Sequence, residues 1–120
     1  MTGETDLVRL LAGLDPALDP VEYSIETVAD ATPLGDAFAL IREAEGVTRV
    51  GAGRGWARIT LRIHSSLEAV GLTARVARAL AERGIAANVI AAVHHDHIFV
   101  PWPCRDEAMA ALHQLARDDR

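Results

Sequence analysis

With 120 residues, the chain is long enough for one ordinary domain, or for two small halves that share a core. Half of the residues are hydrophobic, the net charge at pH 7 is −5, and all 12 basic residues are arginine. The absence of a basic cluster argues against nucleic acid as a partner, because phosphate neutralisation dominates that affinity. The absence of lysine excludes Schiff-base and other lysine-dependent catalysis.

The sequence carries few signals that indicate a cellular compartment or a membrane segment. No apolar run reaches the ~18 residues that a membrane span needs. The first residues, MTGETDLVRLL, lack the basic start followed by an apolar stretch that marks a secretory signal. A single cysteine, Cys104, rules out an internal disulfide and fits a reducing compartment. We therefore expect a cytoplasmic protein without a membrane partner.

The N-terminal part predicts a short helix and a strand. Residues 5–12 carry leucines at helical spacing, and Gly13 is placed to end that helix. Two Asp-Pro pairs at 15–16 and 19–20 are expected to break any helix, because a residue before proline avoids the α region. Residues 21–28 (VEYSIETV) mix β-branched and aromatic residues with polar ones, which predicts a strand.

Residues 37–50 have two interpretations. AFALIREAEG has the propensity of a short helix. Alternatively, 38–41 and 47–50 are two strands that turn at Glu45-Gly46. The position of Gly46 between two apolar runs favours the hairpin. The following GAGRG is expected to be a flexible connector, since it lacks the full dinucleotide-binding pattern and no helix follows it.

The C-terminal part has the clearest periodicity. Residues 57–64 alternate apolar and polar positions, as a half-buried strand does. Ser65 and Glu68 have the spacing of a helix capping box. Further elements are expected in the order of a helix at 72–83, an interior strand at 85–93, a histidine-rich turn at 94–97, a strand to Pro101 and a helix at 105–116.

This β-α-β-β-α order is the ferredoxin-like order without its closing strand. The details resemble an ACT domain, a small regulatory module that binds amino acids. The resemblance rests on Ile63-His64, the loop 65–71, the Gly71-Leu72 helix entry, and Arg83-Gly84-Ile85 leading to Asn88. FALIREAEGVT at 38–48 is similar to the first half of small bacterial proteins with tandem ACT-like halves.

The resemblance implies an α+β, ferredoxin-like ACT fold, with an antiparallel sheet, helices on one face and tandem ACT-like halves. Residues 1–55 would form a degenerate ACT-like half and residues 56–117 the ACT domain. We expect the missing edge to be filled by the strand at 21–28 or by a strand of a partner subunit, because an open edge invites pairing.

A candidate site follows from the strand-to-helix loop. Backbone N–H groups at a helix N-terminus, together with the helix dipole, favour a carboxylate. In ACT domains the amino-acid site lies here and is often completed by the second strand of a neighbouring domain. The implied ligand-binding residues are Ser65, Ser66, Leu67, Glu68, Val70, Gly71, Leu72, Asn88, Val89 and Ile90. The alternative is that Ser65 and Glu68 only cap a helix and that Asn88 satisfies local backbone.

The resemblance implies a regulatory module without catalytic activity or a cofactor. Its partners would be an amino acid or similar small carboxylate, a second copy in a homodimer, and a protein that receives the signal. One alternative is an interaction module without a ligand, which pairs through a sheet edge. A weaker alternative is metal binding through His94, His95 and His97, although no Cys-x-x-Cys or His-Glu-x-x-His pattern accompanies them.

Overall fold

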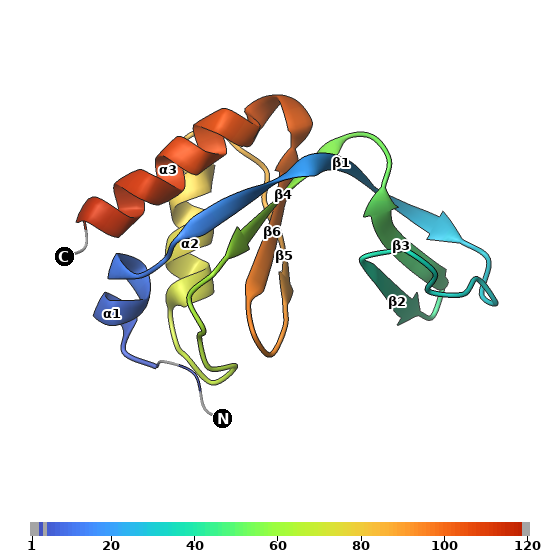
Figure 1. Cartoon of the computed structure of the whole chain (residues 1–120), viewed down its shortest axis with the longest axis horizontal. Helices are drawn as coiled ribbons and strands as arrows, with labels where there is room; N and C mark the ends of the chain where they lie inside the picture. Colours follow the sequence, from blue (N-terminus) through green and yellow to red (C-terminus); the bar gives the residue numbers. More distant parts are fainter. Residues whose placement is uncertain (1–2, 4, 119–120) are drawn as a thin grey trace.

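The computed structural model describes residue 3 and residues 5–118. This part of the chain forms three α-helices, six strands and one short 3-10 helix (Figure 1). In chain order they are α1 (Leu7–Ala12), β1 (Pro16–Val28), β2 (Ala39–Glu43), β3 (Gly46–Ala52), β4 (Trp56–Leu61), α2 (Leu72–Ala81), β5 (Asn88–Ala91), β6 (Asp96–Pro101), η1 (Trp102–Cys104) and α3 (Arg105–Asp118). None of the described helices is long and apolar enough to cross a membrane.

The six strands form one sheet in the order β2-β3-β1-β4-β6-β5, with antiparallel neighbours throughout. Within it, β4, α2, β5, β6 and α3 follow one another as the sequence predicts. The segment β1-β4-β6-β5 is the ferredoxin-like arrangement, in which β1 occupies the place of the closing strand. The edge is therefore filled by a strand of the same chain.

Strand β1 is longer than the sequence predicts and contains both prolines that were expected to break any helix. Pro16 is the first residue of the strand, and Pro20 lies where the pairing with β4 shifts register between Leu18 and Glu22. Strand starts and bulges are positions that tolerate proline, because no ladder hydrogen bond is lost there. The bulge divides β1 into a part that pairs with β4 alone and a part from Tyr23 onward that pairs with β3.

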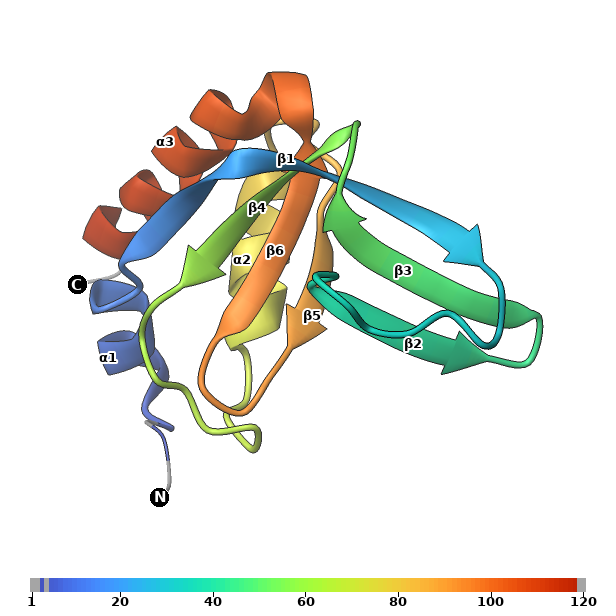
Figure 2. The same cartoon turned by 45° about the vertical axis from the view of Figure 1, so that its right-hand side comes forward.

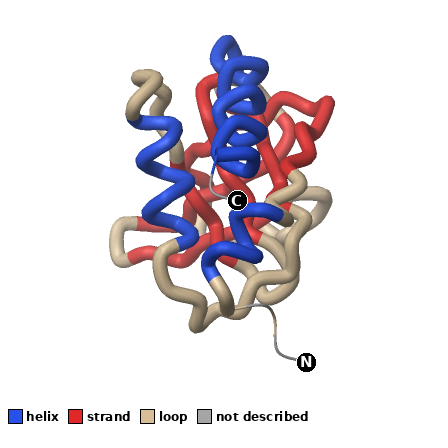
Figure 3. The backbone as a smooth tube through the Cα atoms, turned by 90° about the vertical axis from the view of Figure 1, so that its left-hand side faces the viewer, coloured by secondary structure: helices blue, strands red, loops and turns tan. Residues whose placement is uncertain are grey.

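All three α-helices lie on one face of the sheet, as the figures show (Figures 1 and 3). The alternating residues of β4 and β6 that face them, together with the apolar sides of the helices, form the main core. Its fully buried residues include Leu10, Ile59, Leu80, Ile98 and Leu112. The expected short N-terminal helix is present as α1, and Asp6 caps it by accepting a hydrogen bond from the Arg9 N–H at 3.2 Å.

Strands β2 and β3 form the predicted hairpin and extend beyond the helix-covered part of the sheet (Figure 2). A second apolar cluster lies on the face opposite the helices. Its buried members are Tyr23, Val50 and Phe99, and Phe38, just before β2, packs against them. The rings of Tyr23 and Phe38 each meet Phe99 edge-on with centroids 5.8 Å apart. This cluster joins the hairpin to the rest of the sheet.

Strand β5 differs from its predicted position. The sequence predicts an interior strand because both of its faces are apolar, whereas β5 lies at the edge of the sheet. Its apolar character has another cause. Val89 packs against the main core, while Ile90 packs against the second cluster on the opposite face. Burial on both faces therefore does not require a neighbour on both edges.

Candidate functional site

The loop between β4 and α2 is held by its own backbone and by Ser66. The Ser66 hydroxyl accepts a hydrogen bond from the Glu68 N–H at 3.1 Å, and the Ser66 carbonyl accepts one from the Ala69 N–H at 3.0 Å. The predicted capping box of Ser65 and Glu68 is wrong, because α2 begins only at Leu72 and no side chain caps it. Ser66 stabilises a turn before the helix, and no side chain caps the N-terminus of α2.

Gly71 sets the entry into α2. Its φ of +98° lies in the left-handed region, which glycine adopts at little cost. A Cβ at this position would stand 3.2 Å from a methyl group of Leu7, so α1 packs closely against the start of α2. The first intrahelical hydrogen bond runs from the Arg75 N–H to the Gly71 carbonyl at 3.0 Å. The three preceding N–H groups of α2 consequently have no partner within the helix.

Replacing Gly71 by alanine is expected to lower the free energy of unfolding by about 1–2 kcal/mol, because the left-handed conformation strains an L-residue. Leu7 also has to give way to the new methyl group. Urea denaturation of the variant measures the loss. Gly84→Ala is the matched control, since Gly84 also has a positive φ but its Cβ would meet nothing. Equal losses in the two variants would contradict the contact with α1.

Beneath this loop lies a small cavity of about 60 Å³ with a buried carboxyl group. Ser65, Ser66 and Leu67 of the loop line it, together with the start of α2 and with Ala91 and Asp96 of the sheet. Ser65 and Asp96 are 7% and 9% exposed, the only polar residues in the described part of the chain that are buried. Burial raises the pKa of the Asp96 carboxyl, and a hydrogen bond from Ser65 and the nearby His95 offset this only in part. Asp96 is a site residue that sequence reasoning took for a turn residue.

Within one chain, the predicted site residues fall into two groups. Of the loop residues, Ser65, Ser66, Leu67 and Leu72 line the small cavity, whereas Glu68, Val70 and Gly71 do not, and Val70 is 83% exposed. Asn88 and Ile90 point to the opposite face of the sheet, where they line a larger cleft with Phe99. Val89 faces the helices and lies near Leu72 beneath the start of α2. Within a single chain, Val89 thus meets the loop only at Leu72, and Asn88 and Ile90 do not join the loop residues.

The histidines near the β5–β6 turn have different surroundings. The His94 ring lies 5.9 Å from that of His64. His97 lies under Phe38, with ring centroids 4.8 Å apart, and its Nδ1 is 3.1 Å from the Thr60 hydroxyl. Burial lowers the pKa of His97, and the positive charges of Arg58 and His95 lower it further. Across residues 3 and 5–118, no group of three or more candidate ligands is arranged to hold a metal ion.

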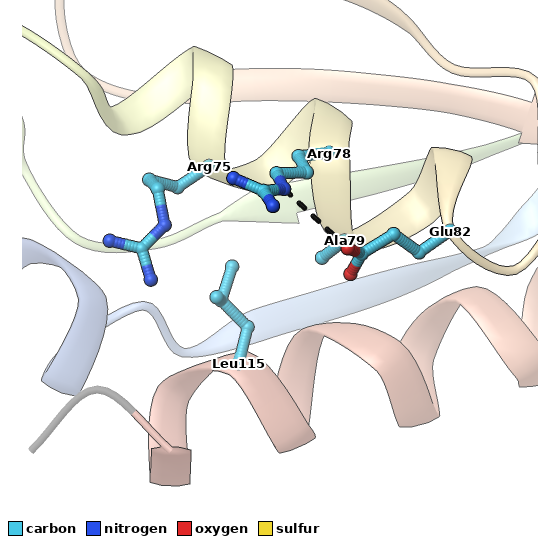
Figure 4. Close-up of a pocket in the computed structure, with 5 residues that line it drawn as sticks. All are labelled: Arg75, Arg78, Ala79, Glu82 and Leu115. Carbon is cyan, nitrogen blue, oxygen red and sulfur yellow. Dashed lines mark ion pairs between the residues drawn. The ribbon is translucent and has the colours of Figure 1, made fainter.

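A further hollow of about 410 Å³ lies between α2 and α3 (Figure 4). Arg75, Arg78, Ala79 and Glu82 of α2 line it together with Leu115 of α3. Arg78 and Glu82 are paired at 3.5 Å, and both side chains are mostly exposed, so solvent screens their attraction. This hollow is a solvated groove between two helices.

Comparison with known families agrees with this fold. Two family models of the ACT domain match the chain, one over residues 52–114 and the other over residues 2–53. The chain therefore belongs to the ACT-domain family. ACT domains are regulatory modules, so this membership indicates a regulatory, ligand-binding module.

Solved structures with the same architecture leave the function open. A protein of unknown function from Vibrio cholerae, described as a possible transport protein, is 40% identical, with a TM-score of 0.75 over 88% of this chain and 92% of that one. A protein from Agrobacterium tumefaciens is 16% identical, with a TM-score of 0.64 over 80% of this chain and 84% of that one, and so shares the fold. No curated protein matches the chain.

Proposed function

We propose that this protein is a cytoplasmic regulatory module that binds an amino acid or a similar small carboxylate at the loop 65–72. It has no catalytic activity of its own and needs no cofactor. The ACT domain at 56–117 holds the site, and the N-terminal half, residues 1–55, supports it through β1. Binding favours one arrangement of the halves or subunits, which a partner protein detects.

The observation that carries this proposal is the pairing of two opposite electrostatic features in one cavity. The first N–H groups of α2, which have no partner within the helix, favour a carboxylate, and the helix dipole adds to this preference. The Asp96 carboxyl in the same cavity offers an acceptor for an ammonium group. An α-amino acid carries both charges on adjacent atoms, so its zwitterionic end matches this arrangement.

The size of the cavity supports a homodimer. About 60 Å³ holds only a few atoms, whereas small-molecule sites usually enclose about 300–1,000 Å³. The rest of the ligand therefore has to be covered from outside the chain. Strand β5, with Asn88, Val89 and Ile90, has a free edge. We propose that β5 of a second copy lies against the loop and completes the site.

A thermal-shift panel of the 20 amino acids tests this function. At about 100 times its dissociation constant, a ligand adds roughly 2.7 kcal/mol, which raises Tm by several degrees for a domain of this size. Asp96→Asn is expected to remove the shift, because a neutral amide loses the charge that attracts the ammonium group. Asp30→Asn is the matched control, since Asp30 is exposed and lies outside the cavity.

The same variant has a pH signature. Because the pKa of Asp96 is raised above its ordinary value near 3.8, the ligand-free protein loses stability as pH rises from that value through the raised pKa. Ionised Asp96 is the form that attracts an ammonium group, so affinity for the amino acid increases over the same window. Calorimetric titrations are expected to show this increase in the wild type but not in Asp96→Asn.

A flat panel would contradict ligand binding at the loop. The protein would then be an interaction module that pairs through β5, as the alternative interpretation predicts. Val89→Pro removes a backbone N–H from this strand, and its effect on the mass in solution would test that pairing.

A further inference from the structure

A second, larger cleft lies on the face of the sheet that the helices do not cover. It has a volume of about 420 Å³ and lies where the sheet curls and brings the hairpin β2–β3 toward β5 (Figure 2). Both parts of the chain contribute to it, and its lining residues are Ile25, Ile41, Thr48, Val50, Trp56, Asn88, Val89, Ile90 and Phe99.

The chemistry of the lining is almost entirely apolar. None of its residues is charged, and Trp56 and Phe99 offer aromatic surface. The Thr48 hydroxyl already donates a hydrogen bond to Glu43 at 2.6 Å. By contrast, the Asn88 amide forms no side-chain hydrogen bond with any residue that the structure describes, although it is able both to donate and to accept.

We propose that this cleft is a second ligand site, which takes a small, neutral, mostly apolar molecule with an aromatic ring and one hydrogen-bonding group. The ring would lie against Trp56 and Phe99, and the polar group would bond to the Asn88 amide. A charged ligand is disfavoured, because no opposite charge among the lining residues offsets the cost of desolvation. This ligand class differs from the zwitterion proposed for the loop.

The dimensions of the cleft suit a small molecule. The volume lies within the range of about 300–1,000 Å³ that is usual for small-molecule sites. Ile25, Ile41, Thr48 and Val50 come from the N-terminal half, and the remaining lining residues come from the ACT domain. A ligand would therefore bridge the two halves and favour the arrangement in which the hairpin lies close to β5.

The test uses 5-fluoroindole, a neutral aromatic molecule with one N–H donor, and follows its ¹⁹F signal during titration with the full chain. We expect saturable binding.

Ile41→Glu is expected to weaken this binding at least about tenfold, because it places a charge in an apolar cleft. Val21→Glu is the matched control, since Val21 and Ile41 are similarly exposed, at 44% and 42%, but only Ile41 lines the cleft. Asn88→Ala is expected to weaken binding about fivefold, by loss of one hydrogen bond.

Two results would overturn the proposal. One is no saturable binding, or equal binding by the Ile41→Glu and Val21→Glu variants. The other is a dimer that dissociates in Ile41→Glu alone, which would mean that a second copy covers the cleft. The thermal shift of the Ile41→Glu variant with amino acids keeps the two sites distinguishable. As long as Ile41→Glu stays a dimer, the loop site predicts that this shift survives, whether or not 5-fluoroindole binds.

Discussion

Replacing Phe99 by alanine is expected to lower the free energy of unfolding by about 3–5 kcal/mol, as is usual when a fully buried aromatic side chain is removed. Phe99 is 0% exposed and has edge-on contacts with Tyr23 and Phe38, and such ring pairs add stability beyond buried area alone. Urea denaturation followed by circular dichroism measures the loss.

The position of Phe99 gives this variant a second signature. Because its cluster joins the hairpin to the remaining sheet, amides of β2 and β3 are expected to lose protection from hydrogen exchange before those of α2 and α3. Ile98→Val is the matched control, with an expected loss of about 0.5–1.5 kcal/mol, because Ile98 is equally buried but faces the helices. A uniform loss of protection in Phe99→Ala would contradict the joining role of the cluster.

Periodicity was sufficient to predict the elements that bury one face. The alternation in β4 fits a strand with one buried face, and the apolar stripe of α2 fits a helix with one buried face. The structure places these elements at Trp56–Leu61 and Leu72–Ala81. The hairpin at 38–50 was predictable because Gly46, with a φ of +145°, separates two apolar runs.

The limits of prediction lie where distant segments meet. Pro16 and Pro20 are compatible with a strand only because one begins β1 and the other lies at its bulge, which the local sequence does not reveal. The edge position of β5 was likewise hidden, since the second cluster covers a face that the ferredoxin-like order leaves open.

The candidate site was predictable only in part. Residues 65–72 follow from the strand-to-helix transition, and Gly71 has the left-handed conformation that the entry to α2 requires. Asp96 was missed because a carboxyl between histidines is a common turn residue, and its burial depends on the register that places it opposite Leu61 and Ala91. That Asn88, Val89 and Ile90 of one chain complete the loop site of a second chain stays a prediction.

Replacing Asp19 by alanine is the second change with a large expected effect, a loss of about 3 kcal/mol of unfolding free energy. Asp19 and Arg58 form a 2.7 Å ion pair on the face opposite the helices, with side chains 18% and 20% exposed. The carboxylate also accepts hydrogen bonds from the Val21 N–H and the Tyr23 hydroxyl. Its removal leaves Arg58 as a mostly buried, unpaired charge, which costs more than the pair itself contributes.

Arg58 makes this loss testable by a double-mutant cycle. Its guanidinium lies 4.4 Å from the centroid of the Phe38 ring, and its Nε is buried without a hydrogen-bond partner among the described residues. Arg58→Met in the Asp19→Ala background is expected to recover at least about half of the loss, since an apolar side chain needs no ionic partner. Asp36→Ala is the control, because its 3.4 Å pair with Arg49 is solvent-exposed on the aspartate side and contributes little.

The stability that the Asp19–Arg58 ion pair contributes also depends on pH, and the direction of this dependence follows from the pKa of Asp19. Burial alone raises the pKa of the Asp19 carboxyl, but hydrogen bonds from Val21, Arg58 and Tyr23 outweigh it and hold the pKa below its ordinary value near 3.8. The stabilisation by Asp19 is therefore complete above that value and is lost as pH falls through the lower folded-state pKa. Asp19→Ala is expected to lack this acid-sensitive component in urea titrations between neutral pH and about pH 3. If the variant loses as much unfolding free energy at low pH as the wild type, the acid sensitivity belongs to other carboxyl groups.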